Sequence, residues 1–239
     1  MTEINQSLPV VIRSKVDHVK NYSEYREILR FDFWFSCGYC EITEFESWGI
    51  GFEIDHYCPK KSHFNLINDY NNLIWSCEKC NRYKHDYYPD EEDKLKGNIV
   101  LRPDKDNPWD HLELEGYLLK GKTHTGNFNI HLLELNRLQL RKLRQIREKL
   151  WNAKKFIAFG IHKIASYKID RMKQRRRRYP FLILRKKFLE REAQINESLD
   201  SVLRQFAKSP FLDEDPEKRE RQKRRRKYLR EQKAIKPSL

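Results

Sequence analysis

The chain has 239 residues, of which 38% are hydrophobic and 35% charged, so it can form one medium-sized domain or two small ones. Its formal net charge is +14 and its mean hydropathy is −0.90. No apolar run approaches the roughly 20 residues that a membrane span needs. The first residues lack the basic and apolar segments of a signal peptide. We therefore expect a soluble, cytoplasmic protein with no membrane contact.

The positive charge is concentrated in one half of the chain. Residues 1–136 carry 16 Lys and Arg against 23 Asp and Glu, whereas residues 137–239 carry 33 against 12. Lysine and arginine side chains displace the counterions that condense along a nucleic-acid backbone, so a basic half favours a polyanionic partner such as DNA. The alternative is a solvated helical face laced with charges.

The first 35 residues are predicted to form an arm followed by a helix over roughly 21–35. Asn21 and Glu24 have the spacing of a capping box, in which each side chain satisfies a free backbone N–H of the other residue. Apolar side chains at helical spacing are expected to face the core. They are Tyr25, Ile28, Leu29 and Trp34.

Two Cys-x-x-Cys pairs predict a metal site. The cysteines are Cys37, Cys40, Cys77 and Cys80. Each pair places two sulfurs about 3.5–4 Å apart, which is one edge of a tetrahedron with Zn–S bonds of about 2.3 Å. Two pairs complete a closed Cys₄ site, so the zinc ion would be structural, and we expect Gly38 to relieve the turn between its neighbouring ligands. The alternative is four unrelated buried thiols.

The 36 residues between Cys40 and Cys77 exceed the usual separation of about 15–20 residues, so an element is inserted there. Residues 49–57 alternate apolar and polar side chains, which predicts a strand with Glu53 and Asp55 on its polar face. Residues 61–72 have the composition of a loop, and residues 73–75 that of a short strand. A helix is expected from about Cys77 to before Pro89. Short strands with a turn at Glu115-Gly116 are expected over 97–119.

Polar side chains in this inserted element have the chemistry that phosphodiester hydrolysis requires. A histidine such as His56 can take a proton from an attacking water near neutral pH. A hard divalent cation stabilises the charge on the phosphoryl oxygens and prefers oxygen ligands such as a carboxylate or an amide. Asp55 precedes His56, and Asn81 follows the predicted zinc ligand Cys80, so both are candidate ligands of such a cation.

These motifs resemble the HNH (ββα-metal) endonucleases. The matching segments are Asp55-His56, Asn72-Leu73, and the run from Cys77 to Lys84 that reads Cys-Glu-Lys-Cys-Asn-Arg-Tyr-Lys. The resemblance implies an α+β fold: a zinc-stapled, treble-clef-like ββα module with an N-terminal helix and a long C-terminal α-helical extension. It also implies DNA hydrolysis, with His56 as general base and Asp55 and Asn81 as Mg²⁺ ligands.

The same resemblance gives roles to two further residues. Asn72 would hold the loop that orients His56. Lys84 would lie near the scissile strand or brace the motif. A narrower similarity covers roughly residues 35–145 and includes Leu135-Asn136-Arg137. It is to the bacterial HNH subgroup that contains the nuclease of Septu-type anti-phage systems, which implies a defence role and an ATPase partner.

The C-terminal part is predicted to be helical and basic over residues 137–211. Apolar positions from Leu143 to Ile164 recur at helical spacing, Pro180 marks a break, and a second helix is expected over 181–208. Residues 212–239 are almost all charged and are expected to be flexible or to form an isolated helix. The side chains expected to contact DNA are Arg175, Arg176, Arg177, Arg178, Lys60 and Arg82.

The sequence therefore predicts an HNH catalytic module over residues 36–136, between the N-terminal arm and the basic helices. The competing hypothesis is a non-catalytic, zinc-dependent nucleic-acid-binding adaptor that docks to an ATPase partner. An HNH site has one active centre per chain, so a double-strand break would need two chains or two visits. A homo-oligomer is therefore left open.

Overall fold

The computed structural model describes residues 11–47, 49–165 and 215–233. The chain divides into two compact units, one made of residues 1–141 with 214–239 and the other of residues 142–213. The first unit contains every predicted metal and catalytic residue. None of the helices in the described ranges has an apolar stretch long enough to cross a membrane.

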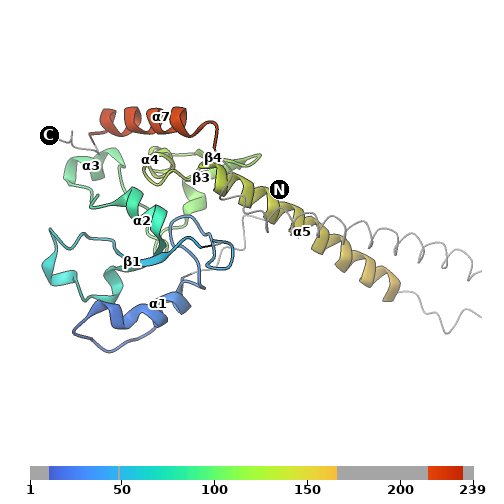
Figure 1. Ribbon diagram of the computed structural model, residues 1–239, viewed down its shortest axis with the longest axis horizontal. Helices are drawn as coiled ribbons and strands as arrows, with labels where there is room; N and C mark the ends of the chain where they lie inside the picture. The colour runs from blue at the N-terminus through green and yellow to red at the C-terminus, as the bar shows by residue number, and fades with distance from the viewer. Residues whose placement is uncertain (1–10, 48, 166–214, 234–239) are drawn as a thin grey trace, which may run out of the picture. The chain divides into compact units, whose positions relative to one another are not determined.

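The centre of the first unit is a ββα arrangement (Figure 1). Strands β1 (Phe52–His56) and β2 (Leu73–Cys77) pair antiparallel, with His56 opposite Leu73 and Phe52 opposite Cys77. Helix α2 (Glu78–Lys84) follows β2 without a loop, and all five residues of β2 are buried. The predicted α+β class is confirmed, as are the two strands and the helix that follows them.

The N-terminal helix is confirmed but is shorter than predicted. A 3₁₀ turn (Tyr22–Tyr25) leads into α1 (Arg26–Asp32), and the Asn21 side chain caps it by accepting the Ser23 N–H. Tyr25 and Leu29 are buried, whereas Ile28 and Trp34 are 39% and 54% exposed. The predicted burial of those two residues is wrong. Trp34 follows the end of the helix with a left-handed φ of 53°, so the helical spacing no longer applies to it.

The rest of the module adds a hairpin and two short helices. Strands β3 (Leu112–Glu115) and β4 (Leu118–Gly121) form the hairpin around the predicted Glu115-Gly116 turn. The helices α3 (Glu91–Lys96) and α4 (His124–Leu132) were not predicted. Short 3₁₀ turns complete the unit, at Phe64–Leu66, Tyr70–Asn72 and Pro108–Asp110.

A long helix, α5 (Leu138–Ala165), begins in the first unit and continues into the second. Leu143 and Ile146 are buried and Leu150 is 37% exposed, which agrees with the predicted amphipathic pattern over the first turns. The predicted helix over 181–208 and the run Arg175–Arg178 lie outside the described residues.

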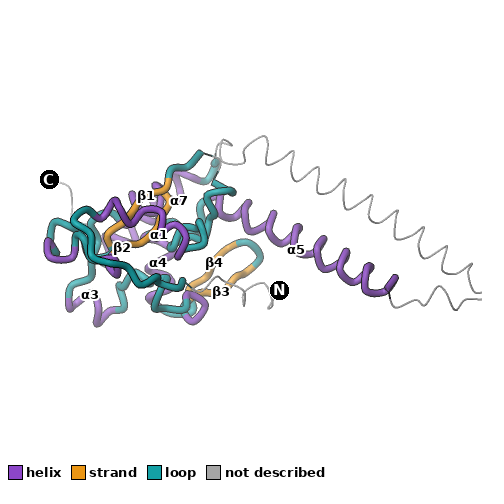
Figure 2. Tube along the Cα trace, turned by 90° about the horizontal axis from the view of Figure 1, so that it is seen from below, coloured by secondary structure: helices purple, strands orange, loops and turns teal. Residues whose placement is uncertain are grey.

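The C-terminal tail differs from its prediction. Helix α7 (Lys218–Glu231) packs against α4, so it is not an isolated helix (Figures 1 and 2). Leu229 is fully buried, and the Tyr228 ring stacks on His131 at 4.2 Å between centroids. Arg225 donates to the carbonyl of Leu132 at 2.8 Å, at the end of α4. The high charge of the tail does not prevent it from packing, because the aliphatic stems of arginines can cover apolar surface while their guanidinium groups bind carbonyls.

Candidate active site and metal centre

The four predicted cysteine ligands meet in one cluster. Their sulfur atoms all lie within 4.8 Å of one another, and the Cys40 and Cys77 sulfurs are 3.8 Å apart. A tetrahedral site with Zn–S bonds of about 2.3 Å has edges of about 3.8 Å, so the cluster fits a zinc ion. The first pair comes from the turn after α1 and the second from the junction of β2 and α2, so such an ion would join the two segments.

Gly38 is required in the first pair for space. A Cβ atom on Gly38 would lie 2.8 Å from a ring carbon of Phe33 and 2.9 Å from Pro103. Its N–H donates to the carbonyl of Trp75 at 2.8 Å, which binds the turn to β2. The expected relief of backbone strain is not the reason, because Gly38 has no positive φ. Close approach to β2 is the constraint.

Asp55 lies at the end of β1 and is only 5% exposed. The Tyr39 hydroxyl donates to it at 2.5 Å, and the Lys84 ammonium lies 3.1 Å from the same carboxylate oxygen. Lys84 is 1% exposed and also donates to the backbone carbonyl of His56 at 2.9 Å. The lysine therefore braces the end of β1, and its charge is directed at Asp55 instead of at solvent.

Burial and partners act in opposite directions on Asp55. Burial raises the pKa of its carboxyl above the ordinary value, while the charge of Lys84 and the hydrogen bond from Tyr39 lower it. The pKa of Tyr39 is raised well above 10 by its own burial and by the Asp55 charge, so the phenol keeps its proton and remains a donor. Tyr39 was not predicted, although its place between Cys37 and Cys40 is a visible signal.

The ring of His56 is fixed by a hydrogen bond and an aromatic contact. Its Nε2 lies 2.8 Å from the carbonyl oxygen of Ile67, and the Tyr22 ring meets it edge-on at 4.7 Å between centroids. Because a carbonyl can only accept, Nε2 carries the proton and Nδ1 has the free lone pair. Burial, aided by the charge of Lys60, lowers the pKa of His56 below 6.5, so the imidazole is neutral near pH 7.

Asn72 holds the loop that leads to this contact. Its side-chain amide donates to the carbonyls of Cys58 and Leu66, at 3.0 and 3.1 Å, and its oxygen accepts the Cys58 N–H at 2.8 Å. Leu66 directly precedes Ile67, whose carbonyl binds His56. The Asn72 amide therefore joins the segment that follows β1, at Cys58, to the segment that carries Ile67, whose carbonyl orients the imidazole.

Asn81 lies on α2, directly after Cys80, and has a partner that the sequence did not suggest. Its Nδ2 donates to a carboxylate oxygen of Glu53 at 2.6 Å. A carboxylate cannot donate, so the amide must present its nitrogen to Glu53, which leaves Oδ1 available to a cation. Glu53 and Asp55 are two residues apart on β1, so the sequence predicted both carboxylates on the same face of the strand. It did not predict that Glu53 would bind and orient the Asn81 side chain.

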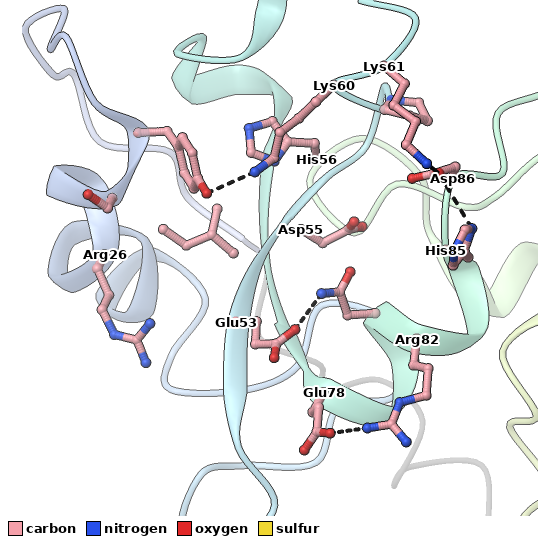
Figure 3. A pocket seen from close by; sticks show the side chains of 15 residues that line it. Arg26, Glu53, Asp55, His56, Lys60, Lys61, Glu78, Arg82, His85 and Asp86 are labelled. Carbon is pink, nitrogen blue, oxygen red and sulfur yellow. Dashed lines mark hydrogen bonds and ion pairs between the residues drawn. The ribbon is translucent and has the colours of Figure 1, made fainter.

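Glu53, Asp55, His56 and Asn81 line one cavity of about 800 Å³ (Figure 3). The side chains of Tyr39, Asn72 and Lys84 do not line it, so they act on it through the residues that they contact. Acidic and amide groups from β1 and α2 lie on its inner wall, and several cationic side chains surround them. The cationic side chains are Arg26, Lys60, Lys61 and Arg82. Of the two predicted DNA contacts here, Lys60 donates to the Tyr22 hydroxyl at 2.8 Å and Arg82 pairs with Glu78, and both are exposed.

Comparisons with known proteins identify this region. Residues 37–87 match the family model "HNH endonuclease", which spans both cysteine pairs, β1, β2 and α2. The chain is 34% identical over 104 residues to "Septu protein PtuB" of Bacillus thuringiensis, covering 43% of this chain and 37% of that protein. It is 30% identical over 135 residues to "Septu protein PtuB" of Bacillus mycoides (strain KBAB4), covering 44% of each chain.

The resemblance stated from the sequence is thereby confirmed: the chain carries an HNH nuclease domain and is similar to Septu PtuB proteins. It matches less than half the length of these curated relatives. No solved structure gives a significant match.

Replacing Lys84 by methionine should destabilise the protein by about 3–5 kcal/mol, because it leaves the Asp55 carboxylate buried without its counter-charge. Urea unfolding at pH 7 measures the change. Lys61→Met is the matched control: Lys61 also binds a carboxylate, that of Asp86 at 2.8 Å, but its side chain is 80% exposed. That pair should contribute no more than about 1 kcal/mol. Equal effects of the two substitutions would contradict the bracing role of Lys84.

Proposed function

We propose that the chain is a metal-dependent HNH endonuclease that hydrolyses DNA phosphodiester bonds. The observation that carries the proposal is the state of His56, a buried and neutral imidazole with Nδ1 unprotonated beside a cavity that Asp55 and Asn81 also line. A neutral imidazole of fixed orientation can take the proton of an attacking water.

The remaining residues prepare the cavity for a cation and a phosphate. Asp55 and the Asn81 Oδ1 would hold Mg²⁺ or another hard divalent cation, which prefers carboxylate and amide oxygens. When bound, that ion would supply positive charge to the phosphoryl oxygens. The charge of Lys84 and the hydrogen bond from Tyr39 favour the ionised form of Asp55 and orient it, and Glu53 fixes the Asn81 amide. Zn²⁺ would occupy the Cys₄ cluster as a structural ion, since four sulfurs leave no position for a substrate.

Capture of DNA needs a basic surface, and α7 supplies one within the first unit. The helix carries nine Lys and Arg against two Glu. Lys223, Arg226, Lys227 and Arg230 line one hollow on its surface and are all exposed. Spacings of three and four residues place them on one face, suited to contacts with successive phosphates. We propose this face as a DNA contact, in addition to Lys60, Arg82 and the predicted contacts at Arg175–Arg178.

The biological setting is part of the same proposal. The similarity to proteins named Septu supports a role in anti-phage defence with an ATPase partner. The adaptor hypothesis, in which the domain binds nucleic acid without cutting it, makes the opposite prediction for His56.

A plasmid assay distinguishes these two functions. Purified protein should cut supercoiled DNA when Mg²⁺ is added and not when it is omitted; omission is a cleaner test than EDTA, which would also extract zinc. His56→Ala should reduce the rate about 10²- to 10⁴-fold, the contribution typical of a positioned base. Asn81→Ala should raise the Mg²⁺ concentration needed. Cutting that is independent of both His56 and Mg²⁺ would exclude the proposed reaction, and DNA binding without cutting would favour the adaptor.

The pH dependence of cutting tests the state of His56. Because its pKa is lowered, the imidazole remains unprotonated below its ordinary value, and the acid limb of the rate profile should have its midpoint below pH 6.5. Lys60→Gln removes a cation that lowers this pKa, so its limb should move to higher pH. Single-turnover rates between pH 4.5 and 8 measure both limbs. A midpoint above 6.5 in the wild type would contradict a buried, neutral base.

Changing the four basic residues of the α7 face to glutamine should weaken DNA binding at low salt. Since each phosphate contact contributes about −0.9 to the slope of log K against log salt, the slope should become shallower by up to about 3–4. Fluorescence anisotropy at several salt concentrations measures it. The control replaces Lys15, Lys20, Lys105 and Lys120, which are exposed elsewhere, and removes the same charge. Identical slopes for the two variants would show that α7 binds no phosphate.

A further inference from the structure

Arg137 was counted among the basic residues of the C-terminal half, but it lies inside the first unit. It is 2% exposed, and its Nη2 atom faces three of the four clustered sulfurs. The distances from Nη2 are 3.3 Å to Cys40, 3.6 Å to Cys80 and 3.8 Å to Cys77. A buried guanidinium is costly unless anionic groups surround it.

No carboxylate among the described residues forms an ion pair with Arg137. The nearby Glu134 is also buried, but its carboxylate binds Arg221, at 3.1 Å. The second terminal nitrogen of Arg137, Nη1, donates to the backbone carbonyls of Leu133 and Glu134 at 3.2 and 3.4 Å. The two nitrogens therefore have separate partners: Nη1 caps the turn after α4, and Nη2 is left to the sulfurs.

A zinc ion with four thiolates has a net charge of −2. The sulfurs of Cys37, Cys77 and Cys80 belong to buried residues, so this charge lies largely away from water. One guanidinium in contact reduces the uncompensated charge to −1 and donates N–H groups to the thiolates. Neutral thiols would give Arg137 only weak acceptors, so its burial is an argument, independent of cysteine spacing, that the cluster holds a cation as thiolates.

We propose that Arg137 is a positioning residue of the metal centre, which retains the zinc ion by neutralising and hydrogen-bonding the thiolates and which thereby ties the start of α5 to the HNH domain. The inference rests on the structural-zinc part of the proposed function. It requires neither DNA cleavage nor the catalytic cation.

The test compares zinc retention in full-length wild type, Arg137→Met and Arg137→Lys. Zinc content after purification should be one ion per chain in the wild type. Release to a chromogenic chelator should be about 10- to 100-fold faster in Arg137→Met, as is typical when a hydrogen-bond partner of a metal ligand is removed. Arg137→Lys keeps the charge without the planar fork of donors and should fall between the two. Arg141→Met, one helical turn later and paired with Glu217, is the matched control and should release zinc like the wild type.

Cobalt substitution separates direct contact with the sulfurs from loss of packing. The sulfur-to-cobalt charge-transfer band should move to longer wavelength in Arg137→Met, because thiolates without N–H donors are richer in electrons. If Arg137→Met does not fold, the same band and release rate are measured in Arg137→Lys. Wild-type release and an unshifted band in the folded variants would overturn the inference. A wild-type protein without zinc would overturn it as well, whereas loss of DNA cutting with these zinc readouts intact would count only against the nuclease.

Discussion

The convergence of four cysteine sulfurs is the constraint on which the site depends. It fixes the turn at Cys37–Cys40 against the start of α2, and residues adjacent to the cysteines then contribute to the candidate active site. Tyr39, inside the first pair, donates to Asp55 at 2.5 Å, and Asn81 directly follows Cys80. A shift of either pair would move a partner or a candidate ligand of the catalytic cation. The sulfur cluster and the candidate active site are therefore linked through residues adjacent in the chain, with no intervening loop to absorb a displacement.

Several buried anionic groups in the interior have a cationic side chain in contact. Asp55 is buried with Lys84, and Glu134 with Arg221, and the sulfur cluster with Arg137. Each of these three groups has a cation in contact, because an unpaired charge in such surroundings would be expensive. A further buried carboxylate, that of Asp32, instead accepts hydrogen bonds from the Ser14 N–H and from the hydroxyls of Ser14 and Tyr70. Lys84 lies on α2, Arg137 directly precedes α5, and Arg221 lies on α7. The C-terminal segments therefore contribute counter-charges to the module that was predicted to span residues 36–136 alone.

The sequence was informative where chemistry is local. The Cys-x-x-Cys spacing, the alternation before His56 and the polar residues around Cys80 were sufficient to predict β1, β2, α2 and the sulfur cluster. It was uninformative where a contact joins distant segments. Glu53 and Asn81 are 28 residues apart, and Arg225 reaches the carbonyl of Leu132 from 93 residues away. The composition of α7 resembles that of a solvated helix, since one buried leucine and the stems of its arginines are enough to dock it.

The docking of α7 changes the meaning of the charge asymmetry. Division at residue 136 separates an acidic half from a basic half, but the folded first unit contains 29 Lys and Arg against 28 Asp and Glu. The first unit is nearly neutral overall, with acidic groups in the candidate cation site and basic groups on α7. In the proposed function, the attraction of DNA therefore depends on where the charges lie in this unit, because their sum is close to zero. Removing residues 137–239 would take away Arg137 and α7 as well as the remaining basic segments, so it would disrupt the fold of the first unit together with the proposed DNA binding. Surface substitutions on α7, which leave Leu229 and Arg225 in place, separate those two effects.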